Sequence, residues 1–220
     1  MTAERLLAWW AAAVLAVAAL SGCSGAAAPA GEPGQRASQP PILMPGAPGE
    51  ANTTISPDDA DALLTQEPNA QDVMFVMMMI PHHAQALRMT GLVEERAQDE
   101  QVVAIAGRIH DAQRVEIAGM EEWLRRHGLD LPRGQEDDHQ AAHMPGMLSA
   151  ADFAALEATQ GADFDRLFLQ KMIAHHQGAL RMADRVLDEG IDVPTRALAA
   201  DVVASQSVEI EILGDMLSQR

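Results

Sequence analysis

The stretch FLQKMIAHHQGALRM at residues 168–182 decides the fold, because a close copy of it, FVMMMIPHHAQALRM, stands at residues 75–89. The two copies belong to a longer duplication. When the chain is shifted by 93 residues, 56–127 aligns with 149–220 without a gap, and 23 of the 72 aligned positions are identical. A repeat of this length predicts that both halves fold as the same supersecondary unit.

Each half is predicted to form a short helix followed by two long ones. Ser56 and Ser149 are typical helix N-caps, each with an aspartate three residues later. Pro81 is expected to kink the first long helix or to loosen one of its turns. The long helices are expected at about 70–97, 100–127, 163–190 and 193–219.

The apolar residues of the long helices recur at alternating intervals of three and four, the spacing of a helix face packed against other helices. This face also carries two histidines in the first long helix of each half, and a glutamine and a glutamate in the second. They are His82, His83, Gln113 and Glu116, and their copies His175, His176, Gln206 and Glu209. Four such faces closing on one another predict an all-α four-helix bundle with pseudo-twofold symmetry, with a short extra helix before each half.

The N-terminal region is typical of an exported protein. Residues 1–22 are interpreted as a lipoprotein signal peptide, because a positive charge precedes an uncharged apolar run that is too short to span a membrane. Cys23, the single cysteine, ends a lipobox-like sequence and is the predicted lipidation site. Residues 23–55 are rich in Ala, Gly and Pro, which predicts a disordered tether. A second irregular stretch, 128–148, is expected to join the repeats.

The composition excludes one class of partner. The formal net charge is −17 and the sequence pI is about 4.6. Nucleic-acid binding depends on basic side chains that meet phosphates, so it is not expected. The protein is expected to contact a membrane through the lipid anchor alone, in the cell envelope outside the cytoplasm, and the sequence indicates no particular protein partner.

The histidine pairs are candidate metal ligands, because neutral imidazole is the commonest metal ligand in proteins. Adjacent helix positions point about 100° apart, so one pair is not expected to hold an ion alone, and His82 is expected to meet either Glu116 or His175 across the bundle. A metal site would then use imidazoles of both halves. Thioethers suit Cu(I) in an exported protein without a free thiol. The sulfur candidates beside the pairs are Met79, Met89, Met172 and Met182, and the inter-repeat loop adds His139, His143, Met144 and Met147.

The alternative to metal binding is a structural role, in which the histidines form a buried hydrogen-bond network that fixes helix register and the methionines only fill the core. In either case Glu116 and Glu209, with Gln113 and Gln206, are expected to orient the imidazoles.

The motif Phe168-x-x-x-Met172-Ile173-x-His175-His176-x-Gly178-Ala179-x-x-Met182 resembles the signature of the bacterial domain-of-unknown-function family 305. So do Gln206-x-x-Glu209-Ile210 and the segment 144–149, and the resemblance covers about 56–220. It implies a ferritin-like bundle in an exported protein, and some members are described as periplasmic copper-binding proteins. The first repeat departs from the pattern, with Pro81 in place of Ala174 and Ala84-Gln85 in place of Gln177-Gly178.

The sequence therefore predicts an exported, lipid-anchored protein that binds a metal ion, copper first of all, for tolerance, storage or handover. A structural or partner-binding envelope lipoprotein without metal is the first alternative. A ferritin-like di-iron oxidase is the second. It is disfavoured because such sites use about four carboxylates, and only Glu116 and Glu209 fall on the predicted core faces. No catalytic residues are predicted.

Overall fold

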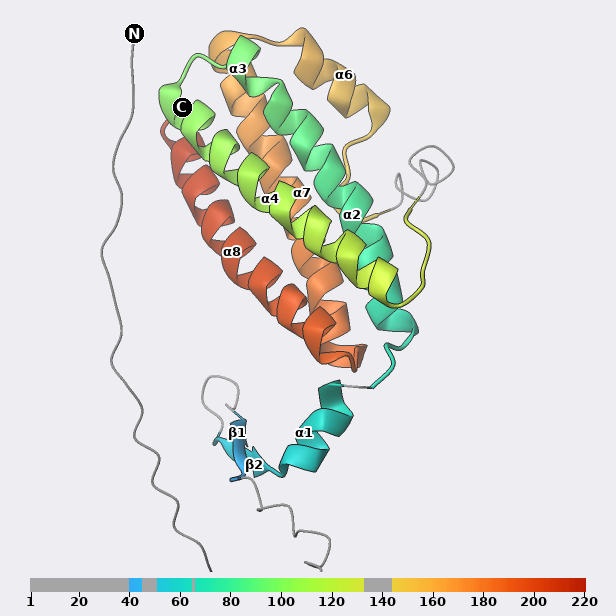
Figure 1. Cartoon of the computed structure of the whole chain (residues 1–220). Coiled ribbons are helices and arrows are strands. Elements are labelled where there is room, and N and C mark those ends of the chain that lie inside the picture. Colours follow the sequence, from blue (N-terminus) through green and yellow to red (C-terminus); the bar gives the residue numbers. More distant parts are fainter. Residues whose placement is uncertain (1–39, 45–50, 65, 133–143) are drawn as a thin grey trace, which may run out of the picture. The chain divides into compact units, whose positions relative to one another are not determined.

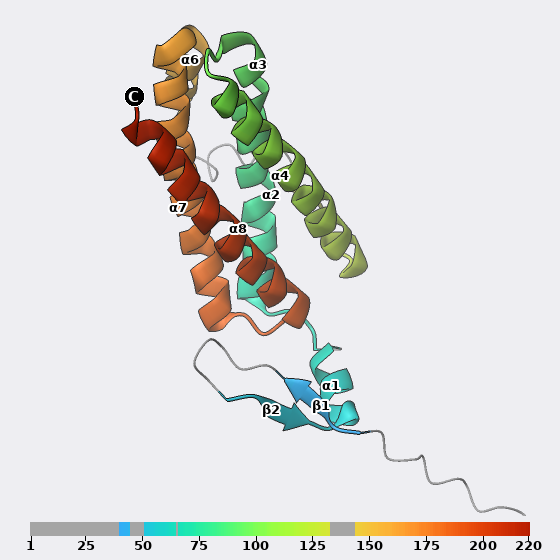
Figure 2. The same ribbon diagram turned by 90° about the vertical axis from the view of Figure 1, so that its left-hand side faces the viewer.

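This computed structural model describes residues 40–44, 51–64, 66–132 and 144–220 of the chain. Four long helices make up most of the described part. They are α2 (Ala70–Gly91), α4 (Glu100–Arg126), α7 (Gly161–Glu189) and α8 (Val193–Ser218). α2 packs against α4, α7 packs against α8, and α2 lies along α7, so two helical hairpins meet through their first helices (Figures 1 and 2). The predicted all-α, ferritin-like four-helix bundle is confirmed.

A short helix precedes each half, as predicted. α1 (Pro57–Leu64) follows Ser56, whose hydroxyl accepts the backbone N–H three residues later at 3.1 Å. α6 (Ala150–Ala158) follows Ser149, whose hydroxyl accepts the equivalent N–H, also at 3.1 Å. The same local signal thus begins both halves.

The structure differs from the expected boundaries in the first long helix. α2 ends at Gly91, and a single turn, α3 (Val93–Arg96), follows it, where one helix over 70–97 was expected. Glycine is a weak helix former, and the equivalent position of the unbroken α7 is Asp184. Pro81 lies inside α2 without ending it.

A short β-hairpin lies in the segment that was expected to be an irregular tether. β1 (Ile42–Met44) pairs antiparallel with β2 (Thr53–Ile55), and Ile42 stands opposite Ile55. The β-branched residues of β2 favour the extended backbone, which the Ala, Gly and Pro content of the segment masked. The predicted signal peptide and Cys23 lie outside the described residues.

Two buried aspartates join the repeats. Asp165, in the first turns of α7, accepts the N–H groups of Gln98 and Asp99 at 3.2 and 3.1 Å. Asp72, at the same place in α2, accepts the N–H groups of Ile191 and Asp192, both at 3.1 Å. Each aspartate therefore holds the turn between the two long helices of the other repeat.

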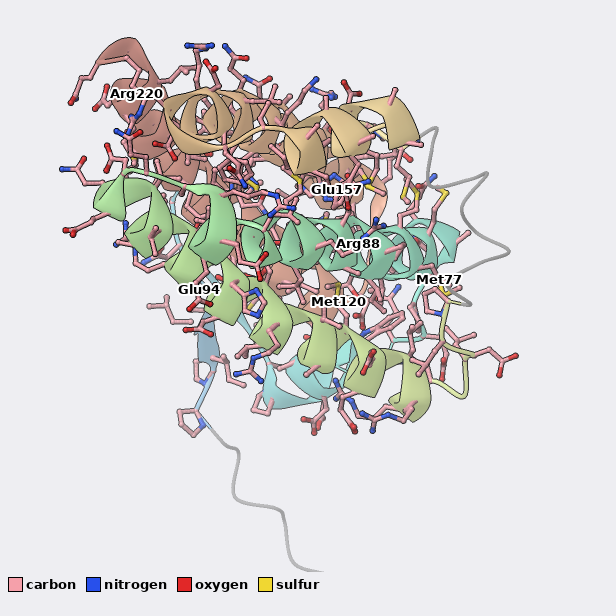
Figure 3. All side chains as sticks on the ribbon, turned by 90° about the horizontal axis from the view of Figure 1, so that it is seen from above. Met77, Arg88, Glu94, Met120, Glu157 and Arg220 are labelled. Atoms are coloured by element: carbon pink, nitrogen blue, oxygen red, sulfur yellow. The ribbon has the colours of Figure 1, made fainter. Side chains whose placement is uncertain are left out.

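Two apolar clusters fill the interior, and each draws on both repeats. One includes Phe75 and Met79 of α2 with Ala179 and Met182 of α7. The other includes the equivalent residues with the helices exchanged: Ala86, Met89, Phe168 and Met172. Figure 3 shows charged side chains such as Glu94 and Arg220 on the outside of the helices. In the described ranges, no helix combines the length and apolar character needed to cross a bilayer.

Candidate metal centre

A polar layer separates the two apolar clusters and crosses all four long helices. It consists of the eight residues predicted from the pattern: His82, His83, Gln113, Glu116, His175, His176, Gln206 and Glu209. The four histidines are fully buried, and both glutamines are nearly so. The side chains of Glu116 and Glu209 are 22% and 17% exposed to solvent, so the glutamates lie at the edge of the layer rather than inside it. An edge position avoids part of the cost of burying a carboxylate.

The two repeats meet at the first histidine of each pair. The ring of His82 on α2 lies on the ring of His175 on α7, with 3.8 Å between ring centroids and 35° between ring planes. Each ring is 6.4 Å from the second histidine of its own pair. Imidazoles from both repeats therefore come together, as the sequence predicted.

The second histidine of each pair faces a glutamate of its own hairpin. His83 Nε2 lies 2.7 Å from Glu116 Oε2 and forms a hydrogen bond with it. His176 Nε2 lies at the same distance from Glu209 Oε2, but its N–H does not point along the contact, so this nitrogen has no aligned partner. The glutamates are placed to orient the second histidines, and neither reaches the first ones.

Burial keeps the first histidines neutral. It lowers the pKa of His82 from 6.5 to about 3; the nearby His83 adds to the lowering, and a hydrogen bond to the Pro145 carbonyl opposes it. Burial also lowers the pKa of His175 well below its ordinary range, with His82 as the second cause. Neutral imidazole is the form that binds metal ions.

Many polar atoms of the layer lack partners. The Nδ1 atoms of all four histidines are buried without a hydrogen bond, as are both amide atoms of Gln113 and Gln206. His175 has no aligned partner at Nε2 either. A buried polar group left without a partner costs about 1–3 kcal/mol, so a bound group that meets these atoms would be stabilising.

The four histidine rings of the layer are not arranged as a chelate. Over the ranges that the structure describes, no three His, Cys, Asp or Glu side chains are arranged to hold one ion. Imidazole lone pairs lie in the ring planes, so two rings that lie one over the other at 3.8 Å do not aim them at a shared point. An ion shared by His82 and His175 therefore requires one of the two rings to turn.

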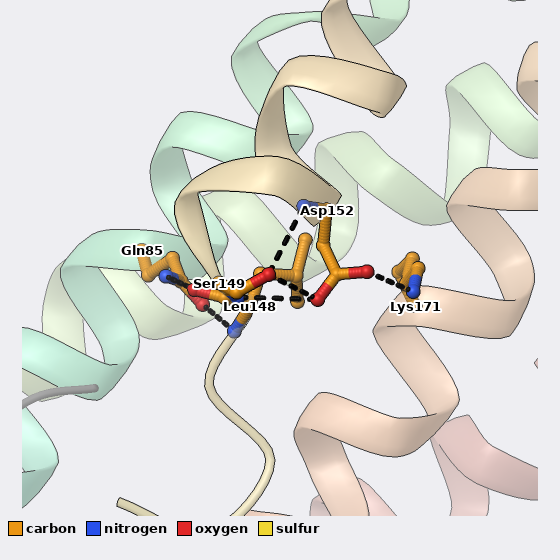
Figure 4. Close-up of polar contacts among 5 residues, drawn as sticks. All are labelled: Gln85, Leu148, Ser149, Asp152 and Lys171. Carbon is orange, nitrogen blue, oxygen red and sulfur yellow. Dashed lines mark hydrogen bonds and ion pairs between the residues drawn. The ribbon is translucent and has the colours of Figure 1, made fainter. Parts of the chain in front are cut away.

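A segment of the inter-repeat loop, residues 145–148, lies against this pair. Pro145 presents its carbonyl to His82 Nε2 at 3.1 Å. Gln85 on α2 holds Leu148 twice: its amide nitrogen donates to the Leu148 carbonyl at 3.0 Å, and its oxygen accepts the Leu148 N–H at 2.8 Å (Figure 4). Gln85 was not predicted as a site residue, because its only signal in the sequence is that it departs from the repeat.

The predicted sulfur donors are all buried in apolar surroundings. Met79 and Met182 pack in one apolar cluster, and Met89 and Met172 pack in the other, on either side of the polar layer. Such burial is also what core packing alone would produce. Of the loop candidates, Met144 is buried and Met147 half-buried, whereas His139 and His143 lie outside the described residues.

A cavity of about 320 Å³ adjoins Pro145 between α2 and α7. Its lining includes the thioethers of Met74, Met78 and Met182, but also Arg181 and Arg185. Two guanidinium groups repel a bare cation, so the polar layer is the better candidate for a metal centre.

The fold and the polar layer together define a class of protein, a duplicated four-helix bundle that buries a histidine pair from each repeat. Comparison with known families gives this class its name. The model of the domain of unknown function DUF305 matches residues 72–217, and the chain belongs to that family. No curated protein sequence matches the chain significantly.

Several solved structures share the fold. A DUF305 fragment from Deinococcus radiodurans is 34% identical, covers 70% of this chain and 100% of its own, and superposes with a TM-score of 0.64. A candidate secreted DUF305 protein from Streptomyces coelicolor is 29% identical over 68% of this chain and 93% of its own, with a TM-score of 0.59. CopM in its Cu(II)-bound form is 28% identical over 67% of this chain and 96% of its own, also with a TM-score of 0.59. CopM has also been solved with Cu(I) and with silver.

Proposed function

We propose that this protein binds copper outside the cytoplasm, at the polar layer, with imidazoles of both repeats as ligands. The observation that carries the proposal is the set of buried imidazole and amide atoms without partners. Apolar side chains in these places would avoid the cost of burying unpaired polar groups. A metal ion offsets that cost because it takes up imidazole lone pairs, and the neutral state of His82 and His175 suits it.

Copper is favoured over other metals by the available donors. Imidazole and thioether together suit Cu(I), and buried methionines flank the layer on both sides. His82, His83, His175 and His176 are the proposed nitrogen ligands, with Met79, Met89, Met172 and Met182 as sulfur candidates. CopM, which shares the fold, is known in copper-bound forms, and this supports the same choice here.

A binding role is proposed rather than a catalytic one. The layer contains two carboxylates, and each stands beside a histidine of its own hairpin. A di-iron oxidase needs about four carboxylates around one pair of ions. The non-metal alternative remains a specific rival, because the hydrogen bond from His83 to Glu116 would also serve to fix helix register.

A Cu(I) titration of the full chain against a competing chelator distinguishes copper binding from the alternative without metal. We expect binding tighter than micromolar, and a loss of at least about 100-fold in the His82→Ala/His175→Ala double variant. His127→Ala is the matched control, because His127 lies at the end of α4 and bonds the backbone of Trp123, away from the layer. Binding weaker than micromolar, or equal affinity in the double variant and the control, would reject the site.

We also propose that the protein is attached to the envelope by a lipid on Cys23. The lipobox-like sequence supports this, and the Streptomyces protein named as a candidate secreted protein agrees with an extracytoplasmic location. Cell fractionation decides it: the full chain should sediment with membranes and the Cys23→Ser variant should not. Equal distribution of the two would contradict the anchor.

A further inference from the structure

The segment 145–148 crosses the boundary between the two repeats and is fixed to both. On the α2 side, His82 donates to the Pro145 carbonyl and Gln85 makes both hydrogen bonds to Leu148. These contacts join backbone atoms of the segment to buried side chains. The segment is therefore fixed to the interior by these contacts, with Leu148 buried and residues 145–147 half-buried.

On the α7 side, the segment touches the helix backbone to backbone. A Cβ atom at Gly178 would stand 1.9 Å from the Pro145 carbonyl oxygen and 2.6 Å from the Gly146 Cα. Gly146 has a positive φ of 82°, and a Cβ there would meet the carbonyl oxygens of Ala174 and His175 at 2.7 Å. Neither position admits a side chain without moving the segment.

Gln85 and Gly178 occupy the same position in the two repeats, because 93 residues separate them. Both positions contact the same segment, Gln85 at Leu148 and Gly178 at Pro145 and Gly146. In the first repeat, the Gln85 amide holds the end of the segment at Leu148. In the second repeat, the missing side chain of Gly178 lets Pro145, at the start of the segment, approach α7. The departure from the repeat is thus explained by an asymmetric loop on a symmetric bundle.

The end of the segment is tied down again at the start of α6. Ser149 and Asp152 cap each other, and Asp152 also forms an ion pair with Lys171 of α7 at 2.6 Å (Figure 4). The hydrogen bond from Lys171, with that from Ser149, lowers the pKa of Asp152 to about 2. The segment is therefore held at both ends.

We propose that residues 145–148 form a fixed cap on the histidine centre, and that Gln85 and Gly178 are its positioning residues. The cap fixes His82 with its proton on Nε2, because the Pro145 carbonyl only accepts a hydrogen bond. The lone pair of the neutral ring then stands on Nδ1, which is buried without a partner. His82 binds copper through Nδ1; this last step rests on the proposed function, whereas the cap and the tautomer do not.

Long-range ¹H–¹⁵N spectra of the imidazoles in the metal-free full chain test the cap. We expect His82 to carry its proton on Nε2, with an N–H that exchanges slowly with water. Gly178→Ala should push Pro145 away and abolish the slow exchange, and Gln85→Ala should do the same by releasing Leu148. The matched controls are Gly119→Ala, whose Cβ meets nothing within 4 Å, and Gln177→Ala, an exposed glutamine beside His176.

The same spectra with Ag(I), a diamagnetic substitute for Cu(I), test the donor atom. Silver should shift the Nδ1 resonance of His82 and leave the Nε2 proton in place, and its affinity should fall about 10-fold or more in Gly178→Ala. A proton on Nδ1 of His82 in the free protein overturns the cap even if copper binds. A proton on Nε2 without any silver or copper binding keeps the cap and rejects the metal function. If Gly178→Ala does not fold, Gln85→Ala and the wild-type tautomer still decide.

Discussion

At the scale of single residues, the histidines of each pair have different environments. The rings of His82 and His175 contact each other across the repeat boundary, whereas His83 and His176 face glutamates within their own hairpins. The first two are the rings that a shared ion would join. The other two are held near carboxylates, in the arrangement that fixes the orientation of a histidine ligand.

The lowered pKa values of the first two histidines predict that the metal-free protein loses stability in mild acid. As the pH falls below 6.5, the unfolded chain takes up protons that folded His82 does not accept until about pH 3. The unfolded state is stabilised over that window, so the free energy of unfolding should fall by about 2 kcal/mol between pH 7 and pH 5 on account of His82, and the lowered pKa of His175 should add to the fall. Urea unfolding at both pH values measures this.

The His82→Gln variant supplies the comparison, because glutamine keeps a donor near Pro145 and does not titrate. Its stability should decrease less between the two pH values than that of the wild type. An equal decrease in both proteins would mean that His82 is protonated in the folded state at pH 5.

The spacing of the apolar residues was enough to predict which eight side chains share the polar layer. It could not predict which histidine of a pair meets the other repeat, because both lie within one broad buried face of a helix. Nor could it predict the roles of Gln85 and Gly178. Both roles depend on where the irregular segment 145–148 packs against the helices, and the spacing of apolar residues along a helix does not predict the position of a loop.

At the scale of elements, the repeats are locked by reciprocal hydrogen bonds. Asp165 of α7 holds the turn before α4, and Asp72 of α2 holds the turn before α8. Carboxylates that accept backbone N–H groups form strong, charge-assisted hydrogen bonds. The two helical hairpins therefore do not depend on apolar packing alone for their register.

Replacing Asp165 with Ala should lower the free energy of unfolding by about 2–4 kcal/mol, because two charge-assisted hydrogen bonds are lost and two N–H groups are left without partners. Asp163→Ala is the control, since this exposed carboxylate lies in the first turn of α7 and forms a surface ion pair with Arg166, and its loss should cost less than about 1 kcal/mol. Urea unfolding at neutral pH compares the two. Equal losses would show that the reciprocal contact does not stabilise the bundle.

The helices themselves were predictable because caps and periodicity agree along them. The disagreement at 70–97 arose where one glycine weakens the last turn of α2, a local effect that the apolar pattern does not record. The hairpin at 42–55 was missed for a related reason, since composition averaged over a long segment hides two short strands.

At the scale of the whole molecule, the duplication creates one centre from two halves. Neither repeat alone brings two first histidines together, and neither has the whole of an apolar cluster. The polar layer interrupts the core where a continuous apolar interior would be more stable. In a protein without other buried histidine pairs among its described residues, this interruption is the feature that function must explain.

The proposed metal centre requires that one ion is shared by both repeats. X-ray absorption at the copper edge of the full chain, loaded with one equivalent of Cu(I), tests this most directly. We predict imidazole scattering from more than one ring in the wild type, and the loss of one ring's contribution in His82→Ala and in His175→Ala alike. A shell without imidazole, or a spectrum that changes in only one of the two variants, would contradict a shared centre.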